Sequence, residues 1–219
     1  GDASLAIDQL ILDLEGMIVP KAPGTEALRV TPEEFAGANE AGTWLTFLTT
    51  TTDEDPTDHT GATRAVSYRL AFQNVIDGSN EEPGHALYRS IAFENALGDA
   101  NHQANYWSNL DDSTTPAPNP PTAIGNFLAG NVVGLQLRFL RADNGEWTAP
   151  GDEVRIGSDA ITVNGSPISG GFTRVEVMLT VLSPDGAERL ARGLIDYNSA
   201  VQQHGTTVLR QTASFLGGR

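Results

Sequence analysis

The 219-residue chain has no cysteine, a single lysine and no long apolar run. The missing cysteines exclude disulfides, thiolate metal sites and cysteine nucleophiles. Because Lys21 is the only lysine, a phosphate-loop or Schiff-base lysine elsewhere is excluded, and no stretch reaches the roughly 18 apolar residues of a membrane span. Basic residues are also scarce: 13 Lys and Arg stand against 28 Asp and Glu, so the net charge is -15 and nucleic acids are not expected as partners.

The motifs of common enzyme classes are missing as well. The sequence has no G-x-G-x-x-G, no Walker loop and no H-E-x-x-H pair. Ser166 and Ser169 lie among glycines, but Ile168 and Pro167 occupy places where a nucleophile elbow needs glycine. We therefore expect no enzymatic activity, no catalytic residue and no cofactor-binding residue. A hydrolase with its site in the 95–121 segment is the alternative that the sequence leaves open.

The best candidate for a metal site is the acidic segment TDEDPTDHTG, which begins at residue 52. Asp53, Asp55 and Asp58 supply hard oxygen ligands of the kind that calcium prefers. An EF-hand loop starting at Asp53 would need glycine at position 58 and glutamate at position 64, and the sequence has Asp and Arg there. A solvated hairpin tip explains the same residues, so a calcium site and a plain acidic turn both stay open.

Residues 2–19 are predicted to form an amphipathic helix. Its apolar side chains recur every three or four residues, at Ile7, Leu10, Ile11, Leu14, Met17 and Ile18. The polar positions off this stripe are Asp8, Gln9, Asp13 and Glu15. Leu5 and Leu12 lie seven residues apart on a second face. We expect the main stripe to pack in the core, and the second face raises the hypothesis that the helix continues upstream in the natural protein.

After the helix the apolar residues alternate with period two, as in β-strands. A three-stranded meander is expected over 43–94, in the segments Thr43–Thr52, Ala62–Val75 and His85–Glu94. A long loop is expected over 95–121, where Asn, Asp and Pro are frequent, followed by a short turn at Ile124–Ala129. More strands are expected within 131–216, in the segments Asn131–Ala142, Glu153–Asn164, Phe172–Leu182 and Thr206–Leu216.

The last two of these strands are predicted to pair, with a helix over 184–204 inserted between them. Strands and helices do not alternate regularly, which speaks against a doubly wound α/β fold. The sequence therefore predicts an α+β fold, in which the N-terminal amphipathic helix packs on antiparallel sheets. Residues 1–219 are expected to form a single domain, because no convincing linker divides them.

The order of these segments resembles that of the J-type minor pseudopilins of type II secretion and of the related prepilin-like Verru_Chthon cassette proteins. The resemblance runs nearly end to end, through SLAIDQLILDLEGMIV, TWLTFLTTTT, RAVSYRLAF, ALYRSIAFE, NVVGLQLRFLRADNGEWT, RVEVMLTVL and TTVLRQTASFL. Its closest part is 132–147, where a strand ending L-x-L-R-F-L runs into a turn and a tryptophan. The 95–121 loop and the 184–204 helix are larger than in the usual family member.

The resemblance implies a pilin-like domain whose helix is the second half of a longer one, the first half being an anchor in the inner membrane. It implies a non-enzymatic subunit of a pseudopilus or type IV pilus-like apparatus for secretion or adhesion, periplasmic and bound to the cell envelope. The implied partners are other minor pseudopilins or pilin-like subunits, with Leu5 and Leu12 at the subunit interface. The alternative is an extracellular β-rich module that binds carbohydrate or calcium, suggested by the acidic turn and the tryptophans.

Overall fold

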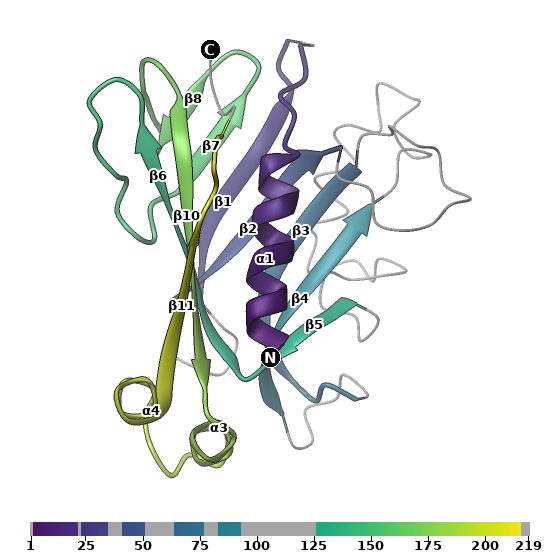
Figure 1. The fold of residues 1–219 in the computed structure, drawn as a ribbon, viewed down its shortest axis with the longest axis vertical. Helices are drawn as coiled ribbons and strands as arrows, with labels where there is room; N and C mark the ends of the chain where they lie inside the picture. The colour runs from purple at the N-terminus through teal and green to yellow at the C-terminus, as the bar shows by residue number, and fades with distance from the viewer. Residues whose placement is uncertain are drawn as a thin grey trace.

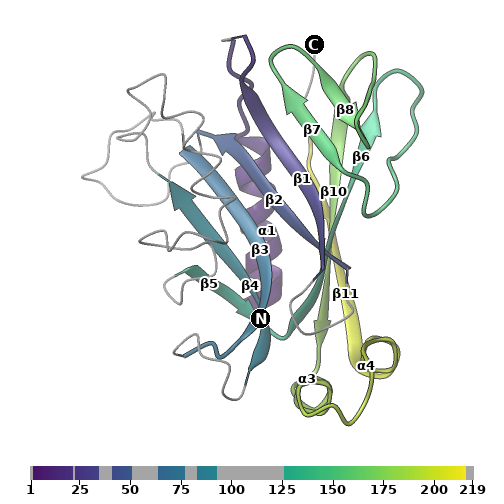
Figure 2. The same ribbon diagram turned by 180° about the vertical axis from the view of Figure 1, so that it is seen from behind.

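A single helix and a three-stranded sheet lie side by side against one face of an eight-stranded sheet in the computed structural model (Figures 1 and 2). The structure describes residues 2–21, 23–34, 41–50, 64–76, 83–92 and 126–215. Its helices are α1 (Asp2–Glu15), α3 (Pro184–Ala191) and α4 (Tyr197–His204). Its strands are β1 (Glu26–Glu34), β2 (Ala41–Thr49), β3 (Arg64–Gln73), β4 (Gly84–Ala92), β5 (Phe127–Gly130), β6 (Val132–Arg141), β7 (Val154–Gly157), β8 (Ile161–Val163), β9 (Ser166–Pro167), β10 (Phe172–Leu182) and β11 (Gly205–Gln211).

Both sheets are antiparallel. The large sheet has the strand order β5-β4-β3-β2-β1-β7-β8-β9, and the small sheet has the order β11-β10-β6. The expected meander is present, because β2 pairs with β3 and β3 with β4. The expected pairing of the last strand is also present, because β11 pairs with β10 from Gly205 to Gln211. The predicted α+β class, with a helix packed on antiparallel sheets, is therefore confirmed.

The chain passes from the large sheet to the small sheet at Asn131. This residue has a positive φ of 59°, a conformation that asparagine tolerates better than most residues. Its N–H donates to the carbonyl of His85 in the large sheet at 2.8 Å, and its carbonyl accepts from Leu182 in the small sheet at 2.9 Å. One residue thus joins the edges of both sheets.

The core lies between the large sheet and the layer formed by α1 and the small sheet. Helix α1 contributes Ala6, Ile7, Leu10 and Leu14, all buried. The facing side of the large sheet contributes Leu28, Val30, Leu45, Phe47, Val66, Tyr68, Leu70, Leu87, Val154 and Ile156. The small sheet contributes Leu135, Leu137, Phe139, Val175, Val177 and Leu179. Each leucine buried in this way stabilises the fold by roughly 1.5–3 kcal/mol.

The helix predicted over 2–19 is shorter than expected, because α1 ends at Glu15. Gly16 begins a turn, and Met17 then pairs with Thr49 in an isolated β-bridge. The N–H of Ile18 donates to the carbonyl of Leu48 at 3.0 Å. Bonds to β2 therefore replace the last helical turn, and the side chains of Met17 and Val19 continue along the core after the helix has ended.

Three other expectations need correction. Strand β1 was not predicted, since its sequence EALRVTPEE contains three glutamates and a proline, yet it pairs with β2 and β7 in the middle of the large sheet. The turn expected at Ile124–Ala129 gives way to β5, an edge strand that begins at Phe127. The helix expected over 184–204 is two helices: Arg192 ends α3, Gly193 has a φ of 67°, and Asp196 caps α4.

Candidate functional site

Helix α1 carries two different faces, and its buried face is not purely apolar. Asp13, which the periodicity places off the stripe, is fully buried beside Leu10 and Leu14. Its carboxylate meets Arg89 of β4: the guanidinium donates from Nε to Oδ2 at 2.8 Å and from Nη2 to Oδ1 at 3.1 Å. A charged pair thus fixes the helix to the sheet within the core.

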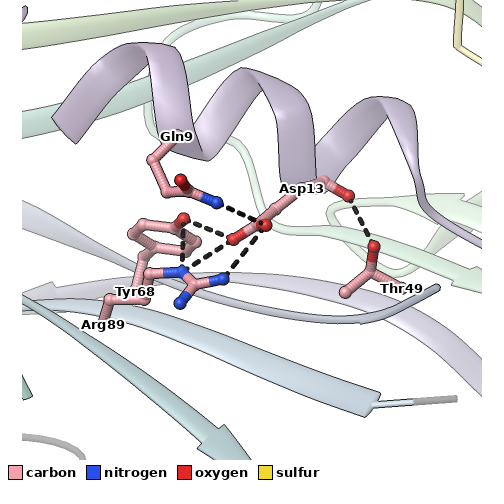
Figure 3. A network of polar contacts seen from close by, with 5 residues as sticks. All are labelled: Gln9, Asp13, Thr49, Tyr68 and Arg89. Carbon is pink, nitrogen blue, oxygen red and sulfur yellow. Dashed lines mark hydrogen bonds and ion pairs between the residues drawn. The ribbon is translucent and has the colours of Figure 1, made fainter. Parts of the chain in front are cut away.

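Three further side chains complete this network (Figure 3). The Tyr68 hydroxyl, from β3, donates to Asp13 Oδ2 at 2.6 Å, and Gln9 Nε2 donates to Oδ1 at 3.1 Å. Thr49 Oγ1 donates to the backbone carbonyl of Asp13 at 2.9 Å. Each carboxylate oxygen therefore receives two hydrogen bonds, which offsets part of the cost of burying the charge.

The phenol of Tyr68 stays protonated in this setting. Burial raises its pKa well above the usual 10.0, and the negative charge of Asp13 raises it further, while Arg89 acts in the opposite direction. Tyr68 and Asp13 have no exposed surface. A substrate in solution cannot reach either group. The network therefore positions the helix and does not contact a substrate.

The opposite face of α1 exposes two leucines. Leu5 is 71% and Leu12 is 55% exposed. Their spacing of seven residues places both on one side of the helix, about 10 Å apart along its axis. The two residues predicted at a subunit interface therefore lie together at the surface.

The small sheet holds α1 along one side, so that this face stays turned outward. Arg210 of β11 donates to Asp8 Oδ1 at 3.0 Å. Glu15 Oε1 accepts from the N–H of Ala213 at 2.7 Å, and that N–H points toward α1 because the neighbouring Thr212 N–H bonds back to Val175. The helix lies along the edge strand of the small sheet (Figure 1), a common protection for a free sheet edge.

The other candidates from the sequence are the acidic segment and the two serines that lie among glycines. Asp53, Asp55 and Asp58 lie outside the described residues, so the calcium site stays a prediction. Within the part of the chain that the structure describes, no group of three or more His, Asp or Glu could hold a metal ion. Ser166 and Ser169 lie on or beside the short strand β9, and Ser169 Oγ lies 3.4 Å from an oxygen of Asp143.

The Asp13 network is not predicted from the sequence, although the strand patterns contain part of the evidence for it. Arg89 alternates in phase with Leu87 and Ile91, and Tyr68 in phase with Val66 and Leu70. An arginine on the apolar side of a strand needs a buried partner. The helical pattern gave no reason to choose Asp13 as that partner, because Asp13 borders the buried stripe rather than lying within it.

Comparisons with known proteins give one structural similarity. No protein-family model and no curated protein sequence matches the chain. A type IV-like pilin from Thermus thermophilus is similar in structure with a TM-score of 0.45 and 11% sequence identity, over 100% of this chain and 97% of that chain. A similarity at this level assigns neither the J-type pseudopilins nor the Verru_Chthon cassette proteins as the family.

Among the described residues, no helix is both long enough and apolar enough to cross a membrane.

Proposed function

We propose that the chain is a non-enzymatic assembly subunit of a pilus-like apparatus, in particular of a pseudopilus or a type IV pilus-like secretion or adhesion machine. One observation carries this proposal: α1 is fixed to the β-sheets by one face and presents Leu5 and Leu12 on the other. A helix that serves its own domain and a neighbouring subunit needs apolar residues on two faces.

The contacts of α1 support this reading because they fix its orientation. The Asp13–Arg89 pair holds one side of the helix, and the Asp8–Arg210 pair holds another. Between these two sides the exposed leucines point away from both sheets. Such a rigid presentation lowers the conformational entropy that a binding partner has to overcome.

The buried cluster of Asp13, Tyr68 and Arg89 also supports a structural role, because its contacts fix α1 to the sheet. Asp13, Tyr68 and Arg89 are residue types that enzymes use, but every oxygen of the Asp13 carboxylate is engaged within the core. The proposal therefore includes no reaction, catalytic residue or cofactor.

The proposed partners are other pilin-like subunits, among them minor pseudopilins. The proposed location is the cell envelope, with the described domain on the periplasmic side and an anchor in the inner membrane. Fractionation of the full-length gene product tests the location: we expect recovery with the inner membrane, and recovery in the cytosol would contradict it.

Photocrosslinking in the producing cells tests the proposed assembly. A p-benzoylphenylalanine at position 5 or 12 is expected to capture the N-terminal helix of a pilin-like subunit, identified by mass spectrometry of the crosslinked peptide. The same group at Ile76, which is 81% exposed on a turn after β3, is the control and should not capture that helix. Equal capture from positions 5, 12 and 76, or no helix captured, contradicts the proposal.

A further inference from the structure

The exposed leucines of α1 lie on a helix beside β11, a strand that also exposes a leucine. Leu209 of β11 is 44% exposed, whereas its neighbour Val208 packs against the core. Because side chains alternate along a strand, Leu209 faces away from the large sheet. Helix α1 lies beside this strand (Figure 1), and Arg210 of β11 pairs with Asp8 of α1. We call the two exposed leucines of α1, Leu5 and Leu12, the leucine surface.

Negative charge borders the leucine surface. Helix α1 has four carboxylates, at Asp2, Asp8, Asp13 and Glu15, and no basic residue. Arg89 neutralises Asp13 and Arg210 neutralises Asp8. Within the described residues, neither Asp2 nor Glu15 forms an ion pair, so the helix keeps two uncompensated charges beside its exposed leucines. The whole chain carries a net charge of -15.

We infer that the leucine surface binds an amphipathic helix of a different polypeptide, with apolar residues at heptad spacing flanked by Lys or Arg, and that it does not bind a second copy of this chain. The inference rests on the proposed function and names the chemistry of its partner. The seven-residue spacing of Leu5 and Leu12 fits the repeat along a helix–helix seam. Basic flanks complement Asp2 and Glu15, whereas a second copy brings the same carboxylates and the same net charge to the contact.

Two matched peptides test the inference with the full chain. Both have about 21 residues and the same leucine ridge over three heptads, but one has lysine and the other glutamate at the flanking positions. By fluorescence anisotropy we expect the lysine peptide to bind at least about ten-fold more tightly, with an affinity that falls as salt rises. Equal binding, tighter binding of the glutamate peptide, or no binding of either overturns the inference.

Variants assign the binding to this surface. The double substitution Leu5→Ser and Leu12→Ser keeps the net charge and is expected to abolish binding of the lysine peptide. Leu194→Ser, at an equally exposed leucine between α3 and α4, is the matched control and should leave binding unchanged. Asp2→Asn combined with Glu15→Gln should remove most of the preference for the lysine peptide. A preference that survives this double substitution contradicts the role of the two carboxylates.

Sedimentation velocity tests the exclusion of a second copy. We expect the chain to stay monomeric at concentrations at which the lysine peptide binds, and a dimer that Leu5→Ser with Leu12→Ser abolishes would overturn the inference. The proposed function is tested separately, by the photocrosslinks from positions 5 and 12. Crosslinks from positions 5 and 12 to a pilin-like helix without basic flanks would support the proposed function and contradict this inference.

Discussion

Asp13 shows how one buried charge fixes the position of a helix. Its carboxylate is closed off from water and receives hydrogen bonds from Gln9, Tyr68 and Arg89. The free energy lost on desolvating a buried ion pair is about as large as the free energy gained from the attraction between its charges. Removing one partner, however, leaves the other charge buried and uncompensated. The network therefore adds little net stability to the fold, but it strongly disfavours any other position of α1 on the sheet.

The first prediction concerns this pair. Arg89→Met leaves the Asp13 carboxylate without its cation, so the free energy of unfolding is expected to fall by about 3–5 kcal/mol. Combining Arg89→Met with Asp13→Leu should recover most of the loss, because no buried charge remains. Urea denaturation of the two single variants and the double variant measures this coupling. Additive losses in the double variant would show that the pair does not act as a unit.

The second prediction concerns pH. Because burial and Asp13 raise the pKa of Tyr68 in the folded state above 10.0, the native state keeps a proton that the unfolded state releases. This contribution to stability is complete below about pH 10 and is lost as the pH rises toward the pKa of the folded state. Stability is therefore expected to decline above pH 10, and Tyr68→Phe should make the decline shallower. Tyr88, whose pKa is also raised by burial, contributes to the same decline, so Tyr88→Phe is the comparison. An unchanged slope in Tyr68→Phe would contradict the prediction.

At the scale of elements, α1 and the two helices before β11 show different kinds of packing. Helix α1 is held in place by its buried apolar side chains and by ion pairs on two sides. Helices α3 and α4 pack closely on one another through Gly186, where an added Cβ would lie 2.3 Å from the Cβ of His204. The sequence pattern predicts the apolar stripe of α1, although not its end at Glu15, and it gives no sign of this close approach between α3 and α4.

The third prediction compares leucines on one helix. Leu10→Ala removes a fully buried side chain and is expected to cost about 2–5 kcal/mol. Leu5→Ala and Leu12→Ala remove exposed side chains, so each should change stability by less than about 0.5 kcal/mol. Thermal or urea denaturation of the three variants measures the difference. A loss above 1–2 kcal/mol at Leu5 or Leu12 would mean that these residues serve the fold of the single chain.

The fourth prediction concerns the α3–α4 contact. Gly186→Ala forces the helices apart and is expected to cost about 1–3 kcal/mol. Ala200 of α4 forms a small cluster with Val133 and Leu182, separate from the main core. Amide hydrogen exchange should therefore speed up in α3 and α4 and stay slow in β3 and β4. Arg192→Ala, at an exposed ion pair, is the control. Faster exchange throughout the core would show that the helices are not a separate unit.

At the scale of the whole molecule, the sequence predicted the antiparallel class, the meander and the β10–β11 pairing, because these strands alternate clearly and depend on local pattern. It did not predict the elements whose conformation depends on tertiary contacts. Strand β1 forms despite Pro32 because β7 pairs with it only as far as Val30, so Pro32 has a strand partner on the β2 side alone. Residues 17–19 leave the helix because β2 offers backbone partners. At the candidate site, the exposure of Leu5 and Leu12 could be read from the helical period. The burial of Asp13 could not, since it depends on an arginine 76 residues away in the sequence.

The central claim is that Leu5 and Leu12 serve assembly and not the fold of the single chain. Replacing both by glutamate in the full-length protein, in the cells that produce it, tests this claim most directly, with recovery of the protein in the purified pilus-like assembly as the readout. We expect a variant with the wild-type melting temperature that is absent from the assembly, while Leu194→Glu is incorporated normally. Normal incorporation of the double variant would show that Leu5 and Leu12 have no role in assembly.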